Sequence, residues 1–354
     1  MIRKNNINVL ITGCGAPGIS GTVYSLKQEN KFVNINIIGT DINPDAVGKF
    51  FCDIFYVIPS FNQKKEYLKK ILEICDSEKI SVIIPQNTLE LEILSTNKEI
   101  FDDQNIKLLL SKNKSIQLSN NKNELMKVAQ SINIPYPKFS LVDNIYDLEK
   151  SIKNLGWPKN KVVVKPPISN GSRGVRIIDE EIDLKSQFFN EKPGSLSSNF
   201  EALKLILGEQ FDELLVMEFL DGEEYTVDVM RTSDKKIVIP RLRGSIKSGI
   251  TFFGKIEKND LIKDYSLKLA DAINLEYCFG FQFKLKNQIP YIIECNPRVQ
   301  GSMVISTLGG ANIILNSILS ILDLKTLEMN LDYSTTFTRY WGGIAINNQG
   351  KKII

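Results

Sequence analysis

The sequence contains no histidine, and this absence excludes several classes of catalysis and metal binding. Serine–histidine and cysteine–histidine nucleophilic catalysis, imidazole acid–base catalysis and histidine metal ligands are all removed together. Any reaction of this chain must therefore use carboxylates, Lys and Arg side chains, backbone amides and a metal that prefers oxygen ligands.

Cysteine pairs at metal-ligand or redox spacing are also missing. The five cysteines stand at positions 14, 52, 75, 278 and 295, and no two of them form a Cys-x-x-Cys motif. Scattered cysteines in odd number favour reduced, buried thiols over disulfides or a zinc site.

A strong excess of charge and long apolar runs are lacking as well. Lys and Arg number 44 against 41 Asp and Glu, so neither a nucleic acid nor an anionic membrane is expected as a partner. The apolar run 313–322 is interrupted by Asn316 and Ser317 and is too short to span a membrane. The first residues lack a signal-peptide pattern, so we expect a cytoplasmic protein. We expect its partners to be small molecules, and we leave open whether it forms a homodimer.

Strand and helix signals alternate through the first hundred residues. Strand-like runs at 8–12, 34–39, 55–58 and 81–85 alternate with helix-like runs at 19–29 and 63–75. This order predicts parallel βαβ units, with ligands at the carboxyl ends of the strands. The polar stretch 111–123 indicates a domain boundary.

Beyond that stretch the pattern changes to mixed α+β. A polar segment, 185–199, is expected to be mobile, and 310–322 is the closing helical run. Predicted strands lie at 161–165, 176–178, 214–218, 224–230, 236–239, 280–285 and 290–294.

Gly13 to Gly18 form a Gly-x-Gly-x-x-Gly motif between a strand and a helix, and Asp41 follows the second strand. This arrangement is typical of a dinucleotide site. Tyr146 and Lys150 have the Tyr-x-x-x-Lys spacing of short-chain dehydrogenases, although they follow a loop rather than lie in a long helix. The other interpretation of the glycines is a tight turn that packs a helix closely on its strand.

A second motif combines a lysine with a small flexible loop. Lys165 ends the apolar run 162–165, and the loop that follows contains Ser169, Gly171, Ser172 and Gly174. A positive charge and free backbone N–H groups suit a triphosphate, whereas the simpler interpretation is a β-hairpin with a glycine-rich turn. Further on, the linker after 214–218 could pair with an adenine edge, and Glu224 could accept hydrogen bonds from ribose hydroxyls.

Glu294, Asn296 and Arg298 alternate along one predicted strand, and Gln282 lies in the preceding one. Side chains two apart share a face of a strand, so a carboxylate, an amide and a guanidinium project together. Such a set fits Mg²⁺ or Mn²⁺ bound with a nucleotide. The other interpretation is a solvated strand edge that ends at Pro297.

Taken in order, these motifs resemble those of ATP-grasp enzymes, and in particular one half of the carbamoyl-phosphate synthetase large subunit. The resemblance covers nearly the whole chain. It implies a Rossmann-like domain at 1–114, an ATP-grasp domain at 115–325 with lobes at about 115–185 and 186–325, and a tail at 326–354 that packs on the grasp domain. In that family the glycine turn of the first domain does not bind a dinucleotide.

The resemblance also implies a role for each motif position. Phosphate contacts fall to Lys122 and Lys165, and the loop Ser169 to Gly174 covers the triphosphate. Met217, Glu218 and Leu220 line the adenine and Glu224 the ribose. The metal ligands are Gln282, Glu294 and Asn296, with Arg298 stabilising the transferring phosphoryl group.

Two positions depart from the family pattern: Asn121 replaces the usual acidic residue before the first lysine, and Gly301 replaces a second arginine. The second change argues against bicarbonate as the substrate. We therefore expect an ATP- and Mg²⁺-dependent ligase that joins a carboxylate to an amine, or to a thiol, through an acyl phosphate. A short-chain-like dehydrogenase and a non-catalytic ATP-binding regulator are the alternatives.

Arg241 and Arg243 share a face of the run 240–249, with Lys247 beyond them. Paired guanidiniums suit recognition of a substrate carboxylate, and a solvated edge strand is the competing interpretation.

Overall fold

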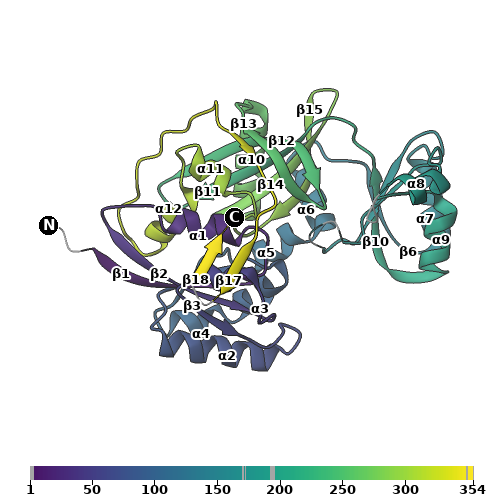
Figure 1. The fold of residues 1–354 in the computed structure, drawn as a ribbon. Coiled ribbons are helices and arrows are strands. Elements are labelled where there is room, and N and C mark those ends of the chain that lie inside the picture. Colours follow the sequence, from purple (N-terminus) through teal and green to yellow (C-terminus); the bar gives the residue numbers. More distant parts are fainter. Residues whose placement is uncertain (1–3, 170, 172, 192–195, 348–349, 354) are drawn as a thin grey trace. The chain divides into compact units, whose positions relative to one another are not determined.

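The computed structural model describes residues 4–169, 171, 173–191, 196–347 and 350–353 (Figure 1). Its internal contacts divide the chain into two compact units. Unit 1 comprises Met1–Gln117, Tyr225–Phe281 and Asn296–Ile354, and unit 2 comprises Leu118–Glu224 and Gln282–Cys295. The boundaries predicted at 114/115 and 325/326 stay predictions.

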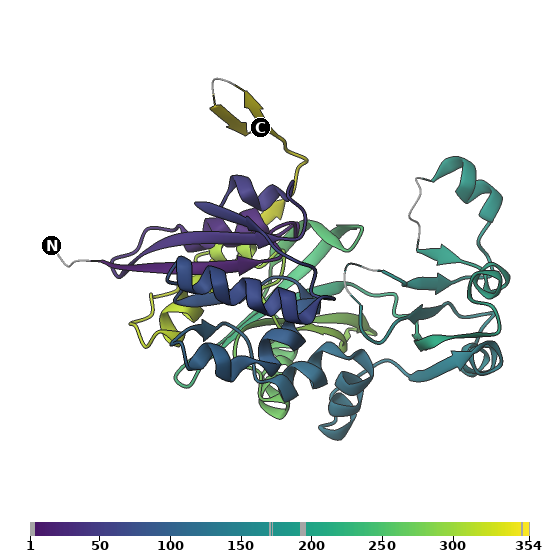
Figure 2. The same cartoon turned by 90° about the horizontal axis from the view of Figure 1, so that it is seen from below.

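A parallel five-stranded sheet opens unit 1, in the order β3-β2-β1-β4-β5. Its strands β1, β2 and β3 are labelled in Figure 1, and the purple strands at the start of the chain are seen from below in Figure 2. Its strands are β1 (Asn5–Thr12), β2 (Val33–Asp41), β3 (Ile54–Val57), β4 (Val82–Pro85) and β5 (Lys107–Leu108). The helical elements are α1 (Ile19–Leu26), η1 (Val47–Phe50), α2 (Lys64–Ser77), η2 (Thr88–Glu90), α3 (Leu91–Thr96), α4 (Lys98–Asp102) and α5 (Asn113–Asn120). Val9 and Ile11 face one core and Leu10 the other, because successive side chains of a strand alternate. The predicted βαβ domain is thus confirmed.

Unit 1 also holds most of an antiparallel sheet, in the order β15-β14-β11-β12-β13-β16. Its strands are β11 (Glu224–Arg231), β12 (Lys236–Lys247), β13 (Ile250–Ile256), β14 (Tyr277–Lys286), β15 (Ile289–Asn296) and β16 (Thr336–Thr338). The accompanying elements are α10 (Asp260–Ile273), α11 (Val304–Leu308), α12 (Ile313–Ile321), β17 (Ile344–Asn347) and β18 (Gly350–Ile353). Leu327, Met329 and Phe337 of the predicted tail pack on the same core as β1 and α12.

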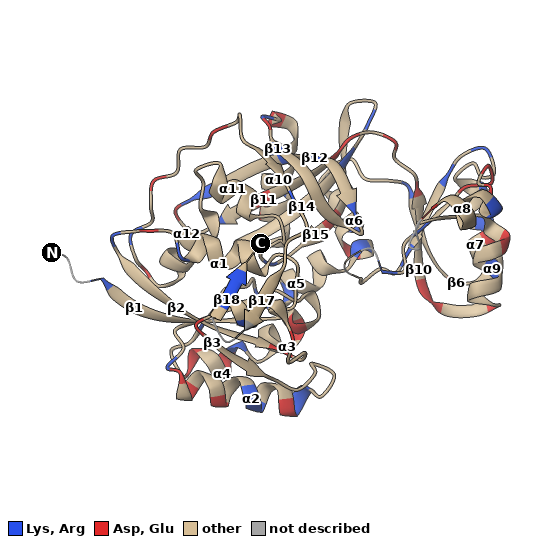
Figure 3. Cartoon of the chain, viewed as in Figure 1, with Lys and Arg blue, Asp and Glu red and all other residues tan. Residues whose placement is uncertain are grey.

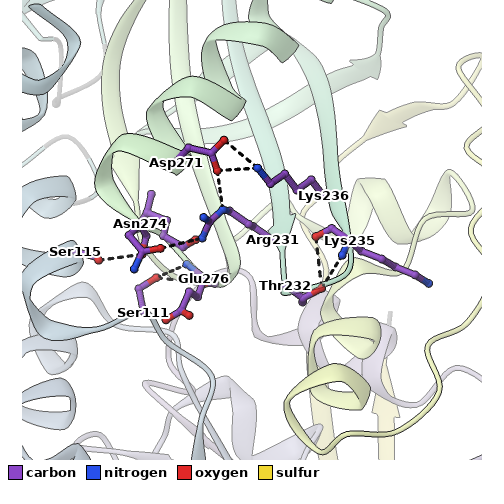
Figure 4. Close-up of polar contacts among 10 residues, drawn as sticks. Ser111, Ser115, Arg231, Thr232, Lys235, Lys236, Asp271, Asn274 and Glu276 are labelled. Carbon is purple, nitrogen blue, oxygen red and sulfur yellow. Dashed lines mark hydrogen bonds and ion pairs between the residues drawn. The ribbon is translucent and has the colours of Figure 1, made fainter. Parts of the chain in front are cut away.

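Polar contacts hold α10 and the turn between α10 and β14 to the end of β11 and to the segment after β5 (Figure 4). The Arg231 guanidinium donates to Asp271 Oδ1 at 3.0 Å and to Leu275 O at 2.8 Å. Ser111 bridges to Glu276, whose backbone N–H donates to Ser111 Oγ at 2.8 Å. These contacts fix the turn after α10, where Asn274 is left-handed with φ of 56°.

Unit 2 is built on a mostly antiparallel sheet, in the order β6-β10-β7-β8-β9. Its strands are β6 (Phe139–Asn144), β7 (Val162–Lys165), β8 (Arg176–Ile178), β9 (Ser197–Ser198) and β10 (Gln210–Glu218). The helices are α6 (Lys122–Ser131), α7 (Ile145–Asn154), α8 (Leu184–Asn190) and α9 (Phe200–Leu207).

Only one face of this sheet is covered by the core that α7 and α9 form. Val162 and Val164 of β7 and Val216 of β10 belong to that core. By alternation along the strands, Lys165 and Met217 project from the opposite face. The sheet therefore separates its packing residues from two of the predicted nucleotide contacts.

Two segments contain helices that the sequence-based interpretation did not predict. Tyr146 and Lys150 lie within helix α7, because the Asn144 side chain caps it by accepting from the Asp147 N–H at 3.0 Å. The polar segment 185–199 contains most of α8 and all of β9, and its residues 192–195 lie outside the described residues. Asp183 caps α8 and so starts this helix, whereas the mobility expected for 185–199 stays a prediction.

Charges of both signs intermix along α2 and α4 (Figure 3), in keeping with the near balance of basic and acidic residues. None of the helices in the described part of the chain combines the length and apolar character needed to cross a membrane.

Glu90 is a carboxyl group enclosed beside the end of β1. It is 2% exposed and accepts a hydrogen bond from the Thr12 hydroxyl. Burial raises the pKa of Glu90 from 4.5 to about 7, and the charge of Asp41 acts in the same direction. Between these values the folded protein holds a proton that the unfolded chain has released, so stability falls as pH rises through this window and levels off above it.

Glu90→Gln should therefore flatten part of the pH dependence of stability. Relative to wild type, we expect it to gain up to about 3 kcal/mol in unfolding free energy between pH 4.5 and pH 8. Urea unfolding of both proteins across this range measures the difference. The exposed Glu92 of α3 supplies the control, Glu92→Gln, and an identical pH dependence in Glu90→Gln and wild type would contradict the assignment.

Candidate active site

Two lysines of unit 2 are almost completely buried. Lys122 is 3% exposed and Lys165 is 7% exposed. Lys122 begins α6 directly after Asn121, whose side chain caps the helix by accepting from the Asn123 and Glu124 N–H groups. Lys165 ends β7, where it is paired with Leu215 of β10. The two lysines are thus positioned by the first residue of α6 and the last residue of β7.

The surroundings of Lys165 are electrostatically unusual. Burial lowers the pKa of Lys165 to about 8, with Lys122 adding to the effect and Glu294 and Glu224 opposing it. The Lys165 ammonium donates to Ile293 O at 3.5 Å. Burying one cation beside another costs free energy, and binding of an anionic ligand would reduce that cost.

Glu294 provides a carboxylate beside this lysine pair. It lies on β15, and its Oε2 is 3.7 Å from Lys122 Nζ. Lys122 Nζ also donates to the carbonyl and hydroxyl oxygens of Ser169, at 3.3 and 3.4 Å. Lys122, Glu294 and Ser169 are far apart in the sequence, and the fold of unit 2 brings them together.

The loop after β7 is only partly described. Ser169 contacts Lys122, and Gly171 and Gly174 have φ of +58° and +72°. A side chain at Gly174 would also collide with Pro166, at 2.7 Å. The predicted loop residue Ser172 lies outside the described residues.

The predicted adenine residues belong to β10 and the turn after it. Met217 and Leu220 are buried, at 3% and 4% exposure. Glu218 accepts from the Lys138 N–H at 3.2 Å and from Lys286 Nζ at 2.8 Å. Its carboxylate is thus held by Lys286, a partner that sequence reasoning missed.

The remaining predicted metal ligands lie on two neighbouring strands. Gln282 is half-buried on β14, and Asn296 is 8% exposed at the end of β15. Within the described residues, no group of three or more acidic or cysteine side chains gathers as a metal site. Carboxylate and amide oxygens are ligands that a hard cation accepts, and metal binding by Gln282, Glu294 and Asn296 stays a prediction.

Arg298 is held by contacts within unit 1. Its Nε donates to Thr88 Oγ1 at 2.9 Å, and its terminal nitrogens donate to Val299 O at 2.9 Å and to Asn296 Oδ1 at 3.3 Å. Thr88 belongs to η2, which follows strand β4 of the parallel sheet. Sequence reasoning missed this residue, because nothing local links positions 210 residues apart.

The two arginines of β12 have different surroundings. Arg241 is fully buried, and its guanidinium donates to Asp228 Oδ1 at 2.7 Å and to Ser302 Oγ at 3.1 Å. Arg243 donates to Thr251 Oγ1 at 3.0 Å and Gly249 O at 2.8 Å. The structure thus gives Arg241 an internal partner, and substrate recognition by Arg241 and Arg243 stays a prediction.

Lys247, the third predicted substrate residue, lies at the end of β12. Its ammonium is 4.8 Å from the centre of the Phe252 ring, a cation–π distance. Its predicted contact with a substrate also stays a prediction.

Asp228 and Arg241 form the centre of a buried polar network. Asp228 also accepts from Ser306 Oγ at 2.6 Å and from Gln300 Nε2 at 3.3 Å. The Gln300 side chain passes over Gly280 to contact Asp228. A Cβ atom added at Gly280 would lie 1.4 Å from Gln300 Nε2, so a glycine is needed at this position. The network fixes the segment that directly follows Arg298.

The glycine motif of unit 1 makes its contacts within the protein. The Gly15 N–H donates to Asp41 Oδ2 at 2.6 Å, so the acid expected at a ribose is used by the turn. A side chain at Gly18 would lie 2.4 Å from the Gly301 Cα. These contacts match the tight-turn interpretation of the motif.

Two family models match the chain. Residues 210–338 match "ATP-grasp in the biosynthetic pathway with Ter operon", and residues 9–109 match "PylC-like, N-terminal domain". The carbamoyl phosphate synthase large chain of Clostridium beijerinckii is 25% identical over 332 residues, which cover 88% of this chain and 28% of that protein. The chain spans about a quarter of the length of the curated relatives it matches.

Solved structures agree on the fold. N5-carboxyaminoimidazole synthetase from Staphylococcus aureus complexed with ADP superposes with a TM-score of 0.67 at 18% identity, covering 93% of this chain and 81% of that one. L-amino acid ligase from Bacillus licheniformis gives a TM-score of 0.64 at 16% identity, covering 93% and 76%. The chain thus matches an ATP-grasp model and a PylC-like N-terminal-domain model over separate segments and shares its fold with these solved structures. The predicted resemblance to the carbamoyl-phosphate synthetase large subunit is confirmed.

Proposed function

We propose that the protein is an ATP- and Mg²⁺-dependent ligase that activates a small-molecule carboxylate as an acyl phosphate and joins it to an amine. The observation that carries this proposal is the pair of nearly buried lysines, Lys122 and Lys165, beside Glu294. Two desolvated ammonium groups suit a polyphosphate, and an adjacent carboxylate suits the cation that accompanies it. The ATP-grasp fold, and its presence in a ligase and an ADP-bound synthetase, supports the same conclusion.

In this proposal Lys122 and Lys165 bind the phosphates, and the Ser169 to Gly174 loop covers them. Met217, Glu218 and Leu220 line the adenine, and the backbone of the linker after β10 offers hydrogen bonds to its edge. Glu224 accepts from the ribose hydroxyls.

Gln282, Glu294 and Asn296 would hold Mg²⁺ or Mn²⁺, which supplies neutralising charge at the phosphate oxygens. A carboxylate oxygen of the substrate attacks the γ-phosphorus and ADP leaves, giving an acyl phosphate. The amine nitrogen then attacks the acyl carbon, and inorganic phosphate leaves with the C–O bond electrons.

Arg298 has the charge to stabilise the phosphoryl group during both steps. Its contacts with Thr88 and Asn296 hold the guanidinium in place, so little reorganisation is needed during the reaction. This chemistry depends on positioning and charge neutralisation and can proceed without histidine.

Thermal unfolding with candidate ligands tests the nucleotide site. A ligand that binds only the folded state raises the melting temperature, so we expect a rise with MgATP, a smaller one with ATP and chelator, and none with NADPH. Glu294→Gln should lose most of the MgATP effect. A rise with NADPH alone would move the active site to the glycine turn and overturn the proposal.

An ADP-release screen over carboxylate and amine pairs then tests catalysis. ADP formation that requires both substrates supports the ligase. MgATP binding with no pair-dependent ADP release across amino acids and small dicarboxylates would favour a non-catalytic ATP-binding protein.

A further inference from the structure

Two of the five cysteines meet inside unit 1, although 37 residues separate them in sequence. Cys14 lies in the glycine turn after β1, and Cys52 follows η1. The Gly48 N–H donates to Cys14 O, and the Cys52 N–H donates to Gly48 O, both at 3.0 Å. Gly48 therefore links the two backbone segments that carry these thiols.

The sulfur atoms themselves share the space above Gly39 of β2. A methyl group added to Gly39 would lie 2.5 Å from Cys52 Sγ and 3.0 Å from Cys14 Sγ. Both sulfurs are therefore close to one point, and the Cys14 thiol donates a hydrogen bond to Ile11 O at 3.2 Å. A glycine at position 39 is what makes room for the two sulfurs.

The two thiols have unequal chemical surroundings. Cys14 is buried, and its pKa is raised by the neighbouring Cys52 side chain and by burial. Cys52 is half-buried, and the neighbouring Cys14 thiol lowers its pKa, with Lys27 acting in the same direction and burial and Asp53 opposing it. A partly accessible thiol with a lowered pKa, beside a buried thiol, is the arrangement in which one sulfur reacts first and the other resolves the product.

We propose that Cys14 and Cys52 form a reversible dithiol–disulfide redox site, with Cys52 as the attacking thiol and a hydroperoxide as the oxidant. The Cys52 thiolate attacks one peroxide oxygen, the O–O bond breaks, and Cys52 becomes a sulfenic acid while the other oxygen leaves as hydroxide. Cys14 then attacks the Cys52 sulfur; its thiol proton and the sulfenic hydroxyl leave as water, and the S–S bond forms. A dithiol reductant then reduces the Cys14–Cys52 disulfide to the two thiols by thiol–disulfide exchange and is itself oxidised to a disulfide.

The disulfide would clamp the Gly13–Gly18 turn to the segment after η1. That turn lies at the carboxyl end of β1, and Gly15 within it contacts Asp41. Oxidation would thus stiffen the backbone at this end of the parallel sheet. The inference is independent of the ligase proposal, since it concerns thiol chemistry in the first domain.

Oxidation of the full, reduced protein with a few equivalents of hydrogen peroxide tests the proposal. Under denaturing conditions, the free thiol count should fall from five to three, and digestion without reductant should yield one peptide pair linked through Cys14 and Cys52. An oxidised protein that keeps five thiols, or a disulfide between other cysteines, would overturn the proposal.

Variants separate the roles of the two thiols. Cys14→Ser should leave Cys52 as a sulfenic acid that dimedone captures, whereas Cys52→Ser should leave Cys14 unreacted. Cys75→Ala, a control that removes a buried thiol elsewhere, should lose the same two thiols as wild type. Equal thiol loss in Cys52→Ser and wild type would contradict the assignment.

Gly39→Ala is a second probe that keeps both thiols. Its methyl group would enter the space between the sulfurs, so disulfide formation should be at least tenfold slower while far-UV circular dichroism remains native. A folded Gly39→Ala protein that forms the disulfide at the wild-type rate would show that the shared space does not matter.

Discussion

Lys165→Ala and Glu294→Gln are each expected to reduce substrate-dependent ADP release by about a hundredfold or more while leaving the fold intact. Removing one preorganised electrostatic contact with the reacting group costs on the order of 3 kcal/mol in the activation barrier. Lys165 is buried beside Lys122, so no water-exposed cation can replace its charge at the phosphates. Glu294→Gln preserves shape but removes the negative charge that a metal ion requires.

Two control variants make the comparison specific. Lys161→Ala removes an exposed lysine just before the same strand, where it pairs with Asp179 at 2.7 Å. Glu213→Gln changes an exposed acid on β10. Both controls should retain near wild-type turnover, and full turnover in both Lys165→Ala and Glu294→Gln would contradict the ligase site.

Measuring MgATP binding in the same variants separates affinity from chemistry. Glu294→Gln should weaken the MgATP-dependent rise in melting temperature more than the rise given by ATP with chelator. Lys165→Ala should weaken both, because the lysine contacts the phosphates themselves.

The parts of the fold that are readable from sequence are those with a local signal. β1 alternates its apolar residues between two cores, and Gly13 to Gly18 lie between strand and helix, so both could be predicted. Lys165 could be predicted for the same reason: it ends an uninterrupted β-branched run. Tyr146 to Lys150 are helical because Asn144 caps α7, and a single capping residue is a weaker local signal than an apolar periodicity.

The contacts that complete the site have no such signal. Thr88 meets Arg298, and Lys286 meets Glu218, only because the folded sheets bring distant segments together. Sequence alternation correctly places Arg241 and Arg243 on one face of β12, but it cannot reveal that Asp228 on the neighbouring strand is the partner of Arg241. Pairing between strands, rather than periodicity along one strand, decides which charges are neutralised internally.

Breaking the buried Asp228–Arg241 pair should have the largest effect on stability. Both side chains are essentially inaccessible to solvent, at 0% and 1% exposure, and their atoms approach to 2.7 Å. Asp228→Ala would leave a buried guanidinium without its counter-charge, and such changes typically cost about 3–5 kcal/mol. Urea unfolding of Asp228→Ala should show this loss as a lower midpoint with an unchanged slope.

The double variant Asp228→Leu/Arg241→Met distinguishes loss of charge balance from loss of packing. Because it removes both charges and fills the space with apolar groups, we expect it to recover most of the stability that Asp228→Ala loses. Gln300 and Ser306 would still lose their acceptor, so the segment after Arg298 should be less firmly held and turnover should stay below wild type. If the double variant were as unstable as Asp228→Ala, cavity formation rather than an unpaired charge would be the cause. If it were both stable and fully active, the network would have no part in positioning Arg298.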